Sequence, residues 1–294
     1  MTDTIKAAIS IAAYIILAPL AGGLLAGLDR KITARMQGRQ GPPLLQSFYD
    51  VGKLLKKETK YMNQIQIICH ITFLIFVIFT GALFFGGFDL LLVFFSLTTA
   101  NLCLVLAATT CNSPYATMGA NREMMQMLAY EPMVLITAVG FYLATGSFKV
   151  KDIVVAEGTL PIVYLPGVFV GFLFILTIKL RKHPFDLSTS HHAHQEMVKG
   201  LTTEFNGLTL VVVEISHWYE NVFLIGVIGL FFLNSKPWSI AVAILAIIIS
   251  YFIEILVDNT NARLKWQNMF KNAWATTIII GVINIFVLQV LRGI

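Results

Sequence analysis

Apolar runs long enough to cross a membrane recur along the chain. Four of them contain no Asp, Glu, Lys or Arg and cover residues 7–28, 65–88, 158–178 and 272–291. A fifth uncharged stretch, 90–121, is interrupted by Asn112, Ser113 and Pro114, which predicts a helix over 90–110 followed by a loop. Because about 20 residues rising 1.5 Å each are needed to cross about 30 Å of hydrocarbon, each run predicts one transmembrane helix.

Three more runs are apolar but hold ionisable side chains. They are 124–148 with Glu131, 205–233 with Glu214, His217 and Glu220, and 237–257 with Glu254. Apolar residues dominate on both sides of each ionisable group, so these runs also predict membrane-spanning helices. The pattern therefore predicts an all-α, polytopic membrane protein of about eight transmembrane helices.

Basic residues alternate between the loops in step with these eight spans. Sixteen lie on one side: Arg30, Lys31, Arg35, Arg39, Lys53, Lys56, Lys57, Lys60, Arg122, Lys179, Arg181, Lys182, Lys199, Arg263, Lys265 and Lys271. Five lie on the other: Lys6, Lys149, Lys151, Lys236 and Arg292. Since Lys and Arg accumulate in cytoplasmic loops, the sixteen mark the inside, and both termini are expected outside.

The composition excludes an ordinary water-soluble domain. Hydrophobic residues make up 57% of the chain and charged residues 13%, with a mean hydropathy of +0.77, whereas soluble domains are about 25% charged. The net charge of +5 lies in loops rather than in a stripe interleaved with aromatic residues, which favours membrane orientation over nucleic-acid binding. The first run is longer than the h-region of a signal peptide, so it is expected to be the first span. Residues 1–294 are predicted to form a single transmembrane domain.

Ionisable groups inside spans are the first candidates for function, because an isolated charge there is costly. Glu214, His217 and Glu220 recur at i, i+3 and i+6, which places them on one helix face as a row that can relay protons. The alternative is that they hydrogen-bond across helices and hold the bundle together.

Ionisable residues inside spans occur at two other places in the sequence. Glu131 precedes Pro132, which frees a backbone carbonyl and lets the carboxyl group meet water or a neighbouring helix. Glu254 and Asp258 are spaced i, i+4 near the inside end of their span, where Asp258 is alternatively a solvated interfacial residue.

Metal-ligating residue types are present but lack the spacing of a metal site. The loop 179–203 holds His183, His191, His192 and His194, yet no thiolate or fixed helical spacing organises them. Cys69, Cys103 and Cys111 lie in or beside apolar runs without a C-x-x-C pair, so they are expected to be packing residues. The sequence predicts neither a metal nor another cofactor in this chain.

The first inside loop, 29–64, is unusually long and basic. It holds eight basic residues and the turn Gly41-Pro42-Pro43. Membrane orientation and contact with lipid headgroups explain the charge. The length exceeds what a connection needs, which favours a docked partner or a lateral amphipathic helix.

Four ordered motifs carry a family resemblance. The first runs from Asp29-Arg30-Lys31 through Gln37-Gly38-Arg39-Gln40-Gly41-Pro42 to Lys53-Leu54-Leu55-Lys56-Lys57-Glu58. The second is Ser113-Pro114-Tyr115-Ala116 with Gly119, Arg122 and Tyr130-Glu131, and the third is Pro184-Phe185-Asp186-Leu187. The fourth is Glu196-x-Val198-x-Gly200 with Thr203-Glu204-Phe205-Asn206-Gly207. Over nearly the whole chain they resemble the complex I membrane subunit of the NADH dehydrogenase subunit 1 family, and its counterparts in energy-converting (Ech-type) NiFe hydrogenases.

Departures from the family pattern point to the hydrogenase branch. Quinone-reducing members have an acidic, Asn- and Arg-containing stretch before Pro-Phe-Asp and acidic residues after it. This chain has Lys179-Leu180-Arg181-Lys182-His183 before and Ser188-Thr189-Ser190-His191-His192-Ala193-His194-Gln195-Glu196 after. The polar groups that would orient a quinone headgroup are replaced.

The resemblance implies a non-catalytic coupling subunit in the cytoplasmic membrane. It would anchor a hydrogenase arm and couple ferredoxin oxidation and proton reduction to translocation of protons or sodium ions. The NiFe centre and 4Fe-4S clusters would lie in partner subunits, and the implied partners are the hydrogenase large and small subunits, an iron–sulfur subunit and an antiporter-like membrane subunit.

Two sets of residues would carry this role. The docking face would comprise the inside loops 29–64 and 179–203, with Arg30, Arg35, Gln37, Arg39, Gly41 and Pro42. The proton-transfer and coupling residues would be Glu131, Asp186, Glu196, Glu204, Glu214, His217, Glu220, Glu254 and Asp258.

Two alternatives stay open. The chain can be the quinone-site membrane subunit of a complex I-like NADH dehydrogenase. It can also be a self-sufficient secondary transporter, although no inverted repeat and no matching pair of Gly- or Pro-interrupted spans is present in the sequence.

Overall fold

The chain folds as an all-α bundle. The computed structural model describes residues 2–58, 60, 63–182, 184–189 and 196–292. The helices are α1 (Thr2–Met36), α2 (Gln46–Leu55), α3 (Gln64–Phe85), α4 (Leu90–Thr109), α5 (Pro114–Thr145), α6 (Val150–Val155), α7 (Pro161–Tyr164), α8 (Pro166–Lys179), α9 (Gly207–Leu230), α10 (Trp238–Thr260), α11 (Trp266–Thr276), the π-helix η1 (Thr277–Val282) and α12 (Ile283–Arg292). No strand forms over the described ranges, so the predicted fold class is confirmed.

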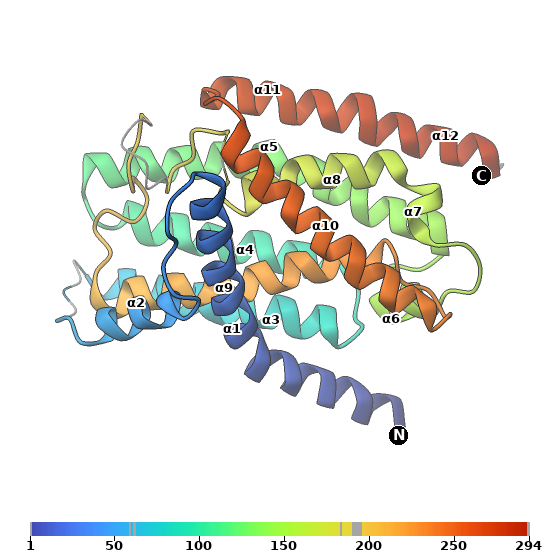
Figure 1. Cartoon of the computed structure of the whole chain (residues 1–294), viewed down its shortest axis with the longest axis horizontal. Coiled ribbons are helices and arrows are strands. Elements are labelled where there is room, and N and C mark those ends of the chain that lie inside the picture. The colour runs from blue at the N-terminus through green and yellow to red at the C-terminus, as the bar shows by residue number, and fades with distance from the viewer. Residues whose placement is uncertain (1, 59, 61–62, 183, 190–195, 293–294) are drawn as a thin grey trace.

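Among the described residues, seven helical segments are long and apolar enough to span a membrane. They are α1, α3, α4, α5, α9, α10 and the continuous α11–η1–α12 segment. Figure 1 shows α3, α4, α5 and α9 running along the long axis, with α10 crossing obliquely and α11–α12 along one edge. The loops near residues 37–45, 110–113, 180–182, 184–189 and 196–206 gather at one end, which we call the loop-rich end.

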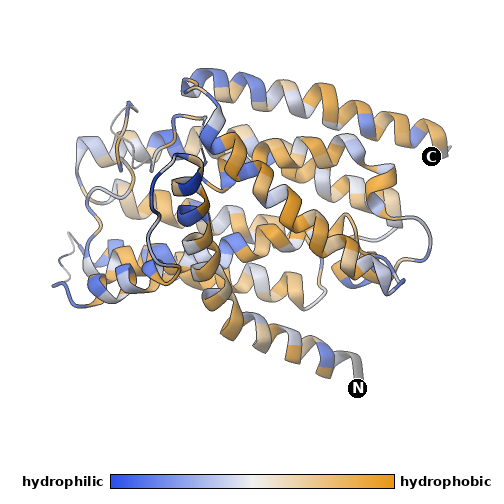
Figure 2. Ribbon diagram, in the orientation of Figure 1, coloured by the Kyte–Doolittle hydropathy of each residue, from blue (hydrophilic) through white to orange (hydrophobic). Residues whose placement is uncertain are grey.

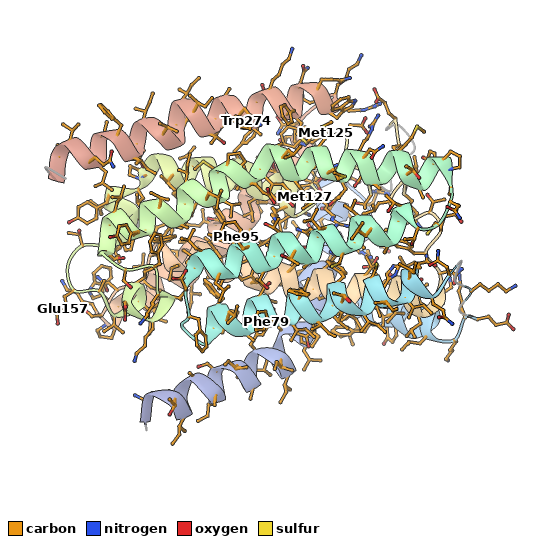
Figure 3. The ribbon with its side chains drawn as sticks, turned by 180° about the vertical axis from the view of Figure 1, so that it is seen from behind. Phe79, Phe95, Met125, Met127, Glu157 and Trp274 are labelled. Carbon is orange, nitrogen blue, oxygen red and sulfur yellow. The ribbon has the colours of Figure 1, made fainter. Side chains whose placement is uncertain are left out.

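The helix faces are inverted relative to those of a soluble protein. In α10 the buried residues include Ser239, Ser250 and Glu254, whereas Ile244 and Ile248 are more than half exposed. Figure 2 shows apolar residues along the outer length of the bundle and hydrophilic residues concentrated at the loop-rich end. Figure 3 shows the opposite side, where Phe79 and Phe95 on α3 and α4 project outward and are about half exposed. Such surfaces are stable only in lipid, so this is a multi-pass membrane protein.

Local sequence fixes where the central helices begin. The side chain of Asn63 accepts a hydrogen bond from the Gln66 amide (2.7 Å) at the start of α3. Asp89 caps α4 in the same way through the Leu91 amide (2.9 Å), and Ser113 caps α5 ahead of Pro114. Each cap satisfies an amide that would otherwise have no partner at a helix start.

Helix α5 begins about ten residues earlier than the sequence indicated. The predicted loop after residue 110 is limited to the residues between Thr109 and Pro114, and the helix continues through Arg122 and Glu123 to Thr145. The prediction was wrong because these charges were taken to mark a loop. In the fold they lie on a helix and are paired with residues from distant loops.

The predicted span 158–178 is broken. Helix α7 ends at Tyr164 and α8 starts at Pro166, so the continuous helix α8 has 14 residues, or about 21 Å at 1.5 Å per residue. That length is shorter than the hydrocarbon thickness of about 30 Å that a spanning helix crosses. The count of eight spans, with both termini outside, therefore stays a prediction.

Asn284 of α12 supplies hydrogen bonds to backbone groups at the break between α7 and α8. Its side-chain carbonyl accepts a hydrogen bond from the Val168 amide (3.0 Å), and its side-chain amide donates to the Tyr164 carbonyl (3.3 Å). These two backbone groups lie at a helix start and a helix end, where intrahelical partners are missing. A side chain of the last helix therefore substitutes for helical hydrogen bonds in an apolar setting.

Substitution of Asn284 by leucine is expected to destabilise the bundle. Each backbone group left unpaired in a buried setting costs about 1–3 kcal/mol. The thermal unfolding midpoint of the purified protein in detergent measures this effect. Gln289→Leu is the matched control, because Gln289 lies exposed on the same helix, and an equal fall in both variants would contradict the role assigned to Asn284.

About half of the first inside loop is helical. Residues 29–36 extend α1, and α2 forms the expected additional helix, packed against α9 and α1. Helix α1 contains Pro19, and Figure 1 shows that it bends along its course. Its close packing depends on glycine: a Cβ on Gly22 would lie 2.4 Å from the Trp218 carbonyl oxygen of α9.

Candidate functional site

A polar cavity of about 650 Å³ opens at the loop-rich end of the bundle. Its walls come from the end of α1, the end of α8 with the loop after it, residues 199–205 and the first half of α9. Its ionisable lining residues are Asp29, Arg30, Arg39, Lys179, Arg181, Lys182, Lys199, Glu214, His217, Glu220 and Asp258. The cavity therefore extends from the loops into the membrane-embedded helices through ionisable groups.

A buried lysine, Lys179, lines this cavity. The Lys179 ammonium is 3.8 Å from Glu220 Oε1, and the two side chains are only 6% and 5% exposed. The same ammonium lies 4.1 Å from the centre of the Tyr130 ring, a cation–π contact. Glu131 and Glu123 also act on it electrostatically. Lys179 thus joins carboxyl groups from α5 and α9.

The row predicted on α9 leads away from this lysine. His217 Nδ1 is 3.4 Å from Glu220 Oε2, and Glu214 lines the same cavity one turn further toward the loops. Helical geometry explains the arrangement, because positions three apart lie on one face. The structure therefore places Glu220 and Glu131 near one lysine, with His217 paired to Glu220 and Glu214 lining the same cavity.

Two arginines and two carboxylates form a second cluster, which we call the arginine network. Arg122 of α5 binds Asp186 (2.9 Å) and Glu196 (2.6 Å). Arg263, in the loop between α10 and α11, reaches Asp186 (3.2 Å) and Glu196 (3.7 Å). The Asp186 side chain is fully buried, whereas Glu196 is 38% exposed. The network thus ties the loop after α8 to α5 and to the last helical segment.

The charge state of Glu196 follows from this network. The hydrogen bond from Arg122 holds the pKa of the Glu196 carboxyl below its usual value, and the positive charges of Arg122 and Arg263 act in the same direction. A carboxyl group with a lowered pKa stabilises the fold above its unfolded value of about 4.3, and this contribution is lost as the pH falls through the lower folded value. The pair is therefore intact at neutral pH.

Glu123 connects the arginine network to the cavity. It follows Arg122 on α5, accepts a hydrogen bond from the Ser188 hydroxyl, and lies 3.6 Å from Arg181 Nη2. Arg181 lines the cavity and is two residues beyond Lys179. Ionisable side chains therefore follow one another from the arginine network to His217, and the charged atoms of Glu123–Arg181, Lys179–Glu220 and His217–Glu220 are 3.8 Å apart or less.

A third group of charges joins α1 to α10. The Lys182 ammonium binds Asp29 and lies 3.7 Å from Asp258. Glu254 is 1% exposed, and Lys182 and Asp258 both act on it electrostatically. Asp258 is therefore paired at the cavity rather than solvated, while Glu254 is buried one turn below it.

The other predicted residues lie outside these clusters or at the cavity rim. Glu204 precedes α9 and acts electrostatically on Cys111. Of the predicted docking residues, Arg30, Arg39 and Pro42 line the cavity, Arg35 is exposed, and Gln37 donates to Asn259 of α10 (2.9 Å). Gly41 packs closely on α1, where an added Cβ would lie 3.0 Å from Lys31 Cα.

Two basic cavity residues hold an uncommon backbone conformation. Arg181 and Lys199 have φ values of 58° and 52°, in the left-handed region that favours glycine. Strained backbone of this kind is found at functional sites more often than elsewhere. Both residues line the cavity with a backbone conformation that their residue types do not favour.

The described residues offer no ligand set for a metal. Over those ranges, no group of three or more His, Cys, Asp or Glu side chains is arranged to hold an ion. Cys111 is buried, donates to the Ala107 carbonyl (3.3 Å), and has a pKa raised to about 11 by burial, so it stays a thiol. The four loop histidines, His183, His191, His192 and His194, lie outside the described residues.

Several residues of the site were missed by the sequence analysis. Lys179, Arg181 and Lys182 were taken as orientation signals because basic residues after a span usually are. Glu123 and Arg263 stood in segments interpreted as loops. The available signal was Arg122 in the second family motif, next to Glu123. Their partners Asp186 and Arg181 cannot be named before the fold brings them together.

Comparison with known proteins identifies the family. The family model described as NADH dehydrogenase matches residues 9–289. The chain belongs to this family. The H subunit of NADH-quinone oxidoreductase from Ehrlichia chaffeensis is 30% identical over 259 residues, covering 76% of this chain and 69% of the relative. The same subunit of Geobacillus sp. strain WCH70 is 28% identical, covering 95% and 91%.

A solved structure extends the comparison to the fold. A chain in the structure of the membrane-bound sulfane sulfur reductase, an archaeal respiratory membrane complex, has a TM-score of 0.84 at 25% identity. The match covers 98% of this chain and 100% of that one. Members of the NADH dehydrogenase family are thus subunits of multi-subunit respiratory membrane complexes, and this chain is a membrane subunit of that type.

Proposed function

We propose that this chain is the membrane subunit of an energy-converting NiFe hydrogenase in the cytoplasmic membrane. It anchors the hydrogenase large and small subunits and an iron–sulfur subunit, and it adjoins an antiporter-like membrane subunit. The NiFe centre and 4Fe-4S clusters belong to these partners and supply the electron transfer from ferredoxin to protons. This chain's own residues couple that transfer to movement of protons or sodium ions.

The observation that carries the proposal is the succession of ionisable side chains through the cavity. Carboxyl, imidazole, ammonium and guanidinium groups follow one another from Asp186 in the loops to Glu220 and His217 inside the bundle. Buried groups that differ in proton affinity and lie within a few ångströms can pass charge between them. A structural anchor alone would be more stable with apolar side chains at these positions.

The coupling step would start at the arginine network. A change of charge in a docked redox arm alters the field at Asp186 and Glu196, which share Arg122 and Arg263. Glu123 lies beside Arg122 and pairs with Arg181, so the change extends to Lys179 and Glu220. A proton held on the α9 row or on Glu131 is then released or taken up as the lysine shifts between carboxylates.

The cavity chemistry favours this function over quinone binding. Quinone headgroup sites are mostly apolar with a few polar groups that orient the ligand. The lining of this cavity carries six basic and four acidic residues, which come from all parts of its wall. The quinone-site alternative is favoured by a different observation, namely that the matched relatives are named as subunits of NADH-quinone oxidoreductase.

Electron acceptors separate these functions. The purified complex, supplied with reduced ferredoxin, is offered protons, a short-chain quinone or a sulfane sulfur compound in parallel. The third acceptor is included because the structural neighbour belongs to a sulfane sulfur reductase. Hydrogen evolution supports the proposal. Quinone reduction that is blocked by a quinone-site inhibitor would establish the alternative instead.

Neutralising two carboxyl groups tests the coupling role. Glu131→Gln and Glu214→Gln keep side-chain size but remove the exchangeable proton, so ion translocation in proteoliposomes should fall about tenfold or more. Glu157→Gln is the control, because Glu157 is exposed at the far end of the bundle (Figure 3). Unchanged translocation and hydrogen evolution in both Glu131→Gln and Glu214→Gln would discard the relay.

A further inference from the structure

A second cavity of about 470 Å³ lies between α2 and α9, next to the polar cavity. Arg30, Lys199, Leu210 and Glu214 line both cavities, so the two adjoin along these residues. The second cavity lies where α2 packs on α9 and α1. Apart from Glu214, its lining residues take no part in the proposed coupling route, which runs through α5, α8 and α9.

The walls of this second cavity are divided into a charged part and an apolar part. The basic residues Arg30, Lys53, Lys57 and Lys199 outnumber the acidic residues Asp50 and Glu214. Val51, Leu54, Leu210 and Trp218 form the apolar part. A ligand that fits both parts has an anionic group joined to a hydrocarbon chain.

The charges available to a ligand are the lysines. Arg30 donates to Asp50 at 2.6 Å, so this pair is satisfied internally. Burial acts to raise the pKa of the Asp50 carboxyl, but hydrogen bonds from Arg30 and Gln46 and the charge of Lys53 hold it below its usual value. Among the residues described, Lys53, Lys57 and Lys199 have no ion-pair partner, which leaves three cations facing one cavity.

Two independent features point to a bound ligand. Lys199 occupies a left-handed backbone position (φ 52°) where glycine would be less strained, and it lines this cavity. Ser47 lines the cavity and is 3% exposed, and its hydroxyl has no hydrogen-bond partner among the described residues. A buried hydroxyl without a partner is uncommon in a folded protein unless a ligand or water completes it.

We infer that this cavity binds one anionic phospholipid from the leaflet at the loop-rich end. The phosphate group contacts Lys53, Lys57 and Lys199, and an acyl chain lies along Val51, Leu54 and Trp218. Basic groups near a membrane surface attract anionic lipids. The apolar walls of the cavity exclude the water that hydrates a free ion. The inference goes beyond the proposed function and does not depend on the electron acceptor.

Lipid binding to the assembled complex tests the inference. Phosphatidylglycerol and phosphatidylcholine with identical acyl chains are titrated in detergent and followed by native mass spectrometry. Phosphatidylglycerol should bind more tightly, and the double variant K53Q/K57Q should weaken it about 30-fold, or about fivefold for each lysine. The matched control K56Q/K60Q removes the same charge from the same segment without touching the cavity and should leave binding unchanged.

Three results would overturn the inference. Equal affinity for the two lipids would show that charge is not recognised. An equal loss in both double variants would indicate a diffuse surface effect. Displacement of the lipid by glycerol phosphate at a similar concentration would assign the site to a soluble phosphate compound. Hydrogen evolution, measured on the same preparations, reports on the proposed function separately.

Discussion

Replacing Lys179 with methionine is expected to abolish ion translocation. The ammonium group is the cation between Glu220, Glu131 and Glu123, and it is almost fully buried. Removing one partner of a buried ion pair leaves the other charge unpaired, at a cost of about 3–5 kcal/mol. Glu220 would then lose the cation that passes charge between the carboxyl groups of α5 and α9. Translocation by proteoliposomes containing the complex should fall to background.

A double variant separates this coupling role from a structural one. K179M/E220Q removes both charges, so the unfolding midpoint should recover toward that of the unmodified protein while translocation stays absent. Lys179→Arg, which keeps the charge, should retain part of the activity. Recovery of translocation in K179M/E220Q would show that the pair serves packing alone.

Asp186→Leu is expected to release the loop after α8 and with it the docking face that we propose. Asp186 is fully buried and is bound by both Arg122 and Arg263. Its loss deprives two guanidinium groups of their buried carboxylate, again at a cost of about 3–5 kcal/mol for a broken buried pair. Partner subunits should no longer co-purify with an affinity-tagged chain.

Glu196→Gln is the control for this prediction. Glu196 contacts the same two arginines but is 38% exposed, so its loss should change the unfolding midpoint little. Co-purification of the partners should be retained at neutral pH. If the two variants behave alike, the burial of Asp186 does not determine the stability of the loop.

Hydropathy predicted most of the fold because lipid requires long apolar helices, but it could not detect the break in α7–α8. Pro161 and Pro166 fall in an apolar run, and the run's composition does not reveal that the helix restarts at Pro166. The start of α5 was missed for the opposite reason. Arg122 is polar and was assigned to a loop, yet its partner Asp186 is 64 residues away in the sequence. The hydropathy pattern along the sequence indicates which residues face lipid or water. It does not indicate which distant residues pair with each other.

The residues of the candidate site also divide into those that local sequence predicted and those that depend on distant contacts. Glu214, His217 and Glu220 were found because helical spacing alone places them on one face. Lys179 was not found, since its role depends on contacts with α9 and α5 that no spacing rule contains. The family motifs marked Asp186, Glu196 and Arg122 as notable residues, and only the fold shows that Arg263 joins them.

The hydrogen bonds from Asn284 have a consequence for how the protein is made. The backbone groups of Tyr164 and Val168 at the helix break are completed by a residue near the end of the chain. During synthesis the Val168 amide and the Tyr164 carbonyl therefore lack these hydrogen bonds until the C-terminal helix has been inserted. We expect a nascent chain halted before residue 284 to be held by membrane chaperones or degraded rather than to reach its final packing.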